Sequence, residues 1–141
     1  MARPKSTKTR TEPEYRLLVV PHVSERTQRP TTLVVLETTK AFATFRYELS
    51  VKAESTPGLL HLTVLGFQTP HLTLPSAGPA RFEKEYYALR GPLDITIQGI
   101  DGRSTTFSLL IGSGTVELVK KPRASFATVT TNLTQWHNRE F

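Results

Sequence analysis

The regular alternation of apolar and polar side chains is the feature that most constrains what this chain can fold into. Over 45–54, every odd position from Phe45 to Ala53 is apolar, and every even position is polar or charged. Successive side chains of a strand point to opposite faces of a sheet, so this period of two indicates a strand with one buried and one wet face. The same alternation returns at 60–64, after the Pro-Gly pair at 57–58 that favours a tight turn. The two runs predict a β-hairpin.

A second hairpin is predicted further along the chain. Apolar and polar residues alternate over 93–98, and Phe107, Leu109 and Ile111 put apolar side chains at every second position further on, with an Asp-Gly pair at 101–102 between the two runs. Asp-Gly between two alternating runs is among the strongest hairpin signals in a sequence, because both residues tolerate the positive φ angles of the turn. Gly-Ser-Gly at 112–114 then reverses the chain into 115–120. The segment 93–120 therefore predicts a three-strand meander.

The rest of the chain from residue 15 onward is also typical of strands. The chain has twenty-one threonines, eighteen of them in this part, and they join many valine, isoleucine, phenylalanine and tyrosine residues in short runs between proline and glycine breaks. β-branched and aromatic side chains suit a pleated, half-buried surface. We therefore predict an all-β fold, an antiparallel β-sandwich of seven to nine strands with the architecture of immunoglobulin or fibronectin type III domains, over 15–121. The expected strands are 15–23, 31–38, 42–54, 59–67, 71–74, 93–99, 105–111 and 115–120.

One segment, 79–91, fits two kinds of structure. Phe82, Tyr86 and Leu89 have helical spacing, a proline stands at the start, and Gly-Pro stands at the end. These are the marks of a short helix. An edge strand followed by a crossover is the alternative, and the β character of the surrounding sequence favours a strand or mixed structure.

Length and composition set the domain organisation. A chain of 141 residues is about one domain long and buries enough surface to need no disulfide, in keeping with the absence of cysteine. Residues 1–14 contain no large apolar residue after Met1, so they have nothing to bury and are expected to form a flexible arm. Residues 122–141 have no clear period, and we expect them to form a flexible C-terminal tail that carries Trp136 and Phe141. A lone tryptophan near a terminus is typical of a residue that pins that terminus to the body or to a partner.

Positive charge is concentrated at the N-terminus. The formal net charge is +6, of which +4 belongs to residues 1–30, so the remainder is nearly neutral. A basic arm attracts nucleic acid, anionic lipid or an acidic protein surface, and it also serves as a solubilising tail. A basic arm on a threonine-rich β body resembles small viral coat proteins and several ribosome-associated proteins, in architecture rather than in any motif. The arm cations that would contact phosphates are Arg3, Lys5, Lys8 and Arg10.

The sequence carries no recognisable catalytic or metal-binding pattern. Its four histidines, at 22, 61, 71 and 137, have no partner at metal-ligand spacing. The Gly-x-Ser-x-Gly motif of serine hydrolases is absent. Glu83 and Glu85 alternate with Arg81 and Lys84, which indicates surface ion pairs rather than paired acid–base carboxylates. We therefore expect no enzyme activity, no metal and no cofactor.

No segment has the length of a signal or membrane sequence. The longest apolar run after the basic start covers 17–20, whereas a secretory signal needs roughly 7–15 apolar residues and a membrane helix about 20. The expected location is the cytoplasm.

These observations predict a non-catalytic β-sandwich interaction module. It would be a small accessory or structural subunit that docks into a larger homo- or hetero-oligomeric assembly through its ends and strand edges. The alternative is a nucleic-acid-associated or capsid-like protein that uses the basic arm, and a third possibility is a carbohydrate- or ligand-binding sandwich with an exposed aromatic platform. The candidate contact residues are Arg3, Lys5, Lys8, Arg10, Tyr86, Tyr87, Trp136 and Phe141.

Overall fold

The computed structural model describes residues 14–42, 48–68, 78–87 and 89–137. In these residues the chain forms nine strands and one short helix. The elements are β1 (Tyr15–Val23), β2 (Pro30–Phe42), β3 (Glu48–Thr56), β4 (Leu59–Gln68), β5 (Gly78–Tyr86), β6 (Gly91–Gln98), β7 (Ser104–Gly112), β8 (Thr115–Lys120), β9 (Ala127–Thr130) and α1 (Leu133–His137).

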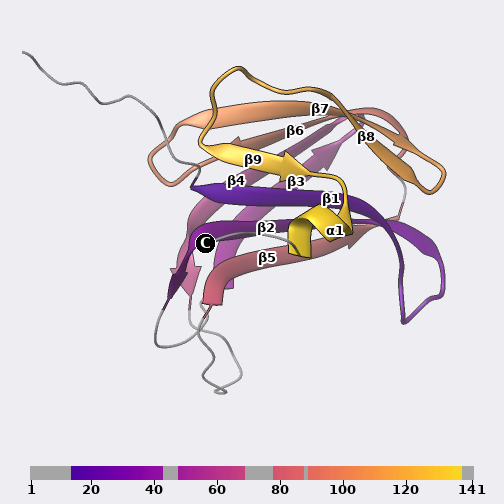
Figure 1. The fold of residues 1–141 in the computed structure, drawn as a ribbon, viewed down its shortest axis with the longest axis horizontal. Helices are drawn as coiled ribbons and strands as arrows, with labels where there is room; N and C mark the ends of the chain where they lie inside the picture. The colour runs from indigo at the N-terminus through magenta and orange to yellow at the C-terminus, as the bar shows by residue number, and fades with distance from the viewer. Residues whose placement is uncertain (1–13, 43–47, 69–77, 88, 138–141) are drawn as a thin grey trace, which may run out of the picture.

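The strands form one mixed sheet that curls into a half-barrel (Figure 1), in the order β8-β7-β6-β4-β3-β5-β2-β1-β9. The predicted all-β fold is confirmed. A two-sheet immunoglobulin-like sandwich is not confirmed, and the expectation of a wholly antiparallel arrangement is wrong, because β1 pairs with β9 and β4 with β6 in parallel. Alternation along a strand shows which side chains are buried, but it does not show which strands become neighbours.

Both predicted hairpins are confirmed, and the structure supplies their registers. Val51 of β3 lies opposite Val64 of β4, and the turn between the strands contains Gly58 at a φ of 77°. In the second hairpin Ile95 of β6 lies opposite Phe107 of β7, and β8 continues the predicted meander. Apolar residues therefore face apolar residues across each ladder, which aligns both strands toward the same core.

The ambiguous segment 79–91 is a strand rather than a helix. It forms β5 and the start of β6, and β5 pairs with β2 along most of its length. The strand expected at 71–74 and part of the one expected at 42–54 (43–47) lie outside the described residues.

The core fills the concave side of the half-barrel. Side chains from every strand contribute to it, since each strand points alternate residues inward. The fully buried ones include Leu17, Val34, Leu36, Leu60, Leu62, Ile95, Ile97, Phe107 and Leu109.

The C-terminal segment is not a flexible tail over 127–137, because these residues belong to the fold. Of the two places expected for Trp136, the body and a partner, the structure shows the body. β9 pairs with β1, and α1 lies on the convex side of β1 (Figure 1). Trp136 of α1 is 2% exposed and packs against Leu18, Val20 and Val35. β1 therefore buries both of its faces, one in the core and one under α1.

Candidate functional site

The sheet opens between β3 and β5. These two strands share one bridge, between Glu48 and Arg81, whereas β3 pairs with β4, and β5 with β2, over much longer ladders. In Figure 1 the two strands start together at the lower left and then separate, β3 running diagonally behind and β5 along the lower edge. Beyond the bridge, each strand presents to the opening a backbone edge that pairs with no other described strand.

Two hollows follow this opening from its narrow end to its wide end. The first, of about 550 Å³, lies where β3 and β5 meet. The second, of about 610 Å³, lies where the end of β3 and its turn face the end of β5 and the start of β6. The narrow hollow is lined by Glu48, Leu49, Ser50, Val51, Arg81, Phe82 and Glu83, and the wide one by Ser55, Thr56, Pro57, Gly58, Tyr86, Tyr87, Leu89, Arg90, Pro92 and Leu93.

The floor of the opening is apolar and only partly covered. Val51 and Ala53 of β3, Phe82 and Tyr86 of β5, and Leu89 pack against the core while remaining partly exposed. Apolar atoms at a sheet edge are normally covered by another element. The opening therefore combines unpaired backbone groups with apolar surface.

The adjacent tyrosines, which the sequence suggested as a contact pair, point in different directions. Tyr86 packs against the core, and its hydroxyl is buried without a hydrogen-bond partner in the described structure. Burial raises the pKa of Tyr86, so this hydroxyl stays protonated. Tyr87 is 38% exposed, and hydrogen bonds to Ser24 and Thr27 lower its pKa. The pair is therefore not a flat aromatic platform.

Charged side chains join β1, β2 and β5 beside the narrow end of the opening. The Glu37 side chain is 2% exposed and accepts hydrogen bonds from Arg16 Nη2 at 3.1 Å and from Arg81 Nη1 at 2.9 Å. Arg81 also pairs with Glu83 at 3.0 Å. A buried carboxylate that is paired twice fixes both neighbouring strands, so β2 and β5 form a firm rim beside the opening.

Trp136, another predicted contact residue, instead contacts the protein's own sheet. The Arg16 guanidinium lies 3.8 Å from the centre of its ring. Through this cation–π contact and the packing described above, the indole lies between α1 and the sheet. The remaining candidates, Arg3, Lys5, Lys8, Arg10 and Phe141, lie outside the described residues.

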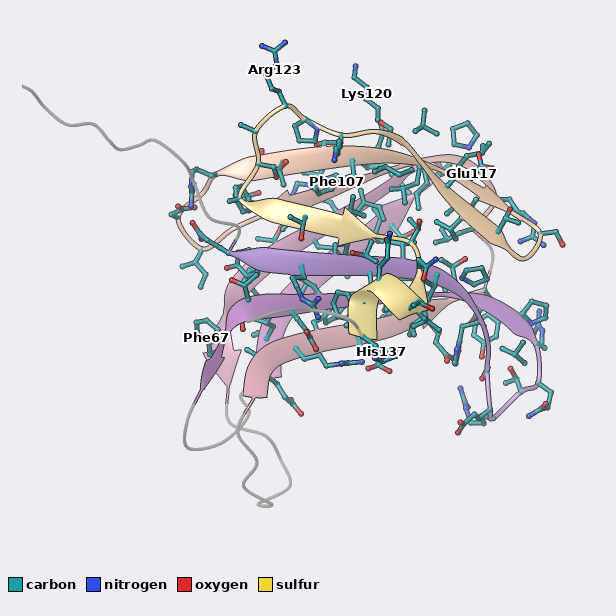
Figure 2. The ribbon with its side chains drawn as sticks, in the orientation of Figure 1. Phe67, Phe107, Glu117, Lys120, Arg123 and His137 are labelled. Carbon is teal, nitrogen blue, oxygen red and sulfur yellow. The ribbon has the colours of Figure 1, made fainter. Side chains whose placement is uncertain are left out.

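Sequence reasoning missed a second group of cations at the end of β8. Lys120, Lys121 and Arg123 are exposed, and Figure 2 shows Lys120 and Arg123 pointing away from the ribbon. Three cations within four residues are a signal that the sequence contained. The concentration of charge at the N-terminus drew attention away from them.

A further hollow lies at one end of the half-barrel, between the β1–β2 hairpin and the β7–β8 turn. Its volume is about 350 Å³. His22, on its wall, pairs with Glu85 at 3.1 Å. The other lining residues are Pro21, Val23, Pro30, Thr31, Thr32, Tyr87, Arg90, Gly112, Ser113, Gly114, Thr115 and Val116.

Within 14–42, 48–68, 78–87 and 89–137, no three histidine or carboxylate side chains gather as metal ligands would. No helix in these described residues has the length and apolar character needed to cross a bilayer. Comparisons with protein-family models, with the curated proteins and with the solved structures find no match to this chain.

Proposed function

We propose that this protein is a non-catalytic interaction module, a small accessory or structural subunit that joins a larger assembly through its strand edges. The observation that carries the proposal is the sheet that stays open between β3 and β5 in the described residues. β3 and β5 separate after a single bridge, and half-buried apolar side chains lie between them. Natural sheets usually cover or blunt such edges, and an edge left open is a template on which another chain adds a strand.

A second candidate function is association with nucleic acid, and a separate observation favours it. Lys120, Lys121 and Arg123 form an exposed basic group on the folded body, in addition to the four cations of the basic arm. Each cation that neutralises a phosphate releases a counterion, so this kind of binding weakens steeply with salt.

Native mass and the ratio of absorbance at 260 and 280 nm, measured on the full chain purified from cells that naturally make it, distinguish the two candidates. An interaction module is expected to elute well above the 15.8 kDa of one chain, free of nucleic acid, at both about 50 mM and about 500 mM salt. A nucleic-acid-binding protein is expected to carry absorbance at 260 nm that disappears in high salt. A monomer free of nucleic acid at low salt contradicts both.

A further inference from the structure

We propose that the opening between β3 and β5 binds an extended peptide segment of a partner protein, with an acidic side chain facing Lys84. This inference rests on the proposed function and names the kind of partner.

The geometry of the opening matches an extended chain. β3 continues for eight residues beyond the bridge at Glu48, to Thr56, and its side away from β4 has no described strand beside it. An added strand of about six residues, at roughly 3.3 Å per residue, spans about 20 Å along such an edge. Backbone hydrogen bonds to β3 would supply affinity without regard to sequence.

The two faces of the added strand would meet different surroundings. Inward side chains would lie on the partly exposed floor formed by Val51, Ala53, Phe82, Tyr86 and Leu89, so they should be apolar. Outward side chains would continue the convex face, where the β3 residues are Ser50, Lys52 and Glu54, so they should be polar. The opening therefore selects a segment that alternates apolar and polar residues.

Charge then selects among such segments. Lys84 shares its side of β5 with Phe82 and Tyr86, which line the two hollows, yet it is exposed. Its Nζ lies 5.2 Å from the centre of the Tyr86 ring. At the wide end, Arg90 is also exposed. An inward acidic residue of the partner would pair with Lys84, and a basic residue there would be repelled.

An inward-facing lysine on a strand edge also has a protective use, since it discourages pairing with a second copy of the chain. The two roles are separated by two variants, because a glutamate at this position would discourage pairing as the lysine does. Loss of protection produces self-association of the uncharged Lys84→Ala variant without any peptide, whereas a binding role makes Lys84→Glu change which peptide is bound.

The experiment uses two synthetic seven-residue peptides added to the full chain. Both alternate threonine and valine, and the central inward residue is glutamate in one and lysine in the other. Isothermal titration and amide hydrogen exchange measure binding. The expected result is about three- to fivefold tighter binding of the glutamate peptide by the natural chain, from one partly exposed charge pair, and the reverse preference in Lys84→Glu. Slower exchange is expected at 50–56.

Lys120→Glu is the matched control, because Lys120 is an exposed lysine at the end of another strand, and it should leave the preference unchanged. Equal affinity of both peptides, no binding of either, or unchanged exchange at 50–56 each overturns the proposal. Self-association of Lys84→Ala assigns the edge to a second copy and also overturns it. If the native assembly forms while 50–56 keeps the exchange rate of the monomer, the interaction function stands and the peptide site fails.

Discussion

We expect the C-terminal helix α1 to contribute substantially to the stability of the protein. Replacement of Trp136 by alanine tests this. A tryptophan side chain buries about 150–250 Å². At about 25 cal/mol per Å² this corresponds to about 4–6 kcal/mol, an upper bound because unfolded chains already bury part of their surface. Trp136 is 2% exposed, so nearly all of this area is removed from water.

The position of α1 limits how much stability Trp136→Ala can lose. α1 is five residues long and follows β9 at the end of the described chain, so in Trp136→Ala it can detach instead of leaving a cavity. Detachment exposes Leu18, Val20 and Val35 on the convex side of β1 and β2. We therefore expect a loss of about 3 kcal/mol, at the low end of aromatic-to-alanine changes in cores, and a fall in melting temperature of about 10 °C.

Urea unfolding followed by far-ultraviolet circular dichroism measures this loss. Trp136 is the single tryptophan of the chain, so the fluorescence of the natural protein reports this site alone, and its emission should shift to the red on unfolding. Leu133→Ala is the matched control, because Leu133 lies on the same helix and is 46% exposed. It should change stability by less than about 0.5 kcal/mol. Equal midpoints for the two variants, or emission typical of an indole in water before unfolding, would refute the docked position of α1.

Three further predictions concern buried polar groups. Tyr86→Phe should leave stability unchanged or raise it by up to about 1 kcal/mol, because it removes a buried hydroxyl that has no partner; a clear loss in urea unfolding would show that the hydroxyl is hydrogen-bonded. Glu37→Gln should lower stability by about 3 kcal/mol, since it leaves two arginines beside a buried neutral amide. Glu54→Gln is the exposed control, and equal urea midpoints for the two variants would contradict this. Burial raises the pKa of Tyr15 and of Tyr86 above 10.0. Because these raised values favour the protonated form in the folded state, their contribution is complete below pH 10 and is lost as the pH rises above it. The urea midpoint should therefore fall between pH 9.5 and 11, less steeply in Tyr86→Phe; parallel curves would argue against this origin.

Alternation along the chain determined the local structure of this protein. Period two in β3 and β4, and Asp-Gly between β6 and β7, were enough to predict two hairpins and their buried faces. This information is local, because a strand's two faces and a tight turn depend on residues that are close in sequence.

Tertiary structure alone decided which strands that are distant in the sequence became neighbours. Nothing in β5 shows that it lies between β2 and β3, or that it meets β3 at a single bridge, because pairing between distant strands depends on how the whole sheet packs. The same holds for Trp136. The sequence left open whether this lone tryptophan pins the terminus to the body or to a partner, and only the fold shows that it packs against Leu18, Val20 and Val35 on the convex face of β1 and β2. The opening beside Lys84 likewise exists because two strands separate in space, and so only the fold could bring its parts together.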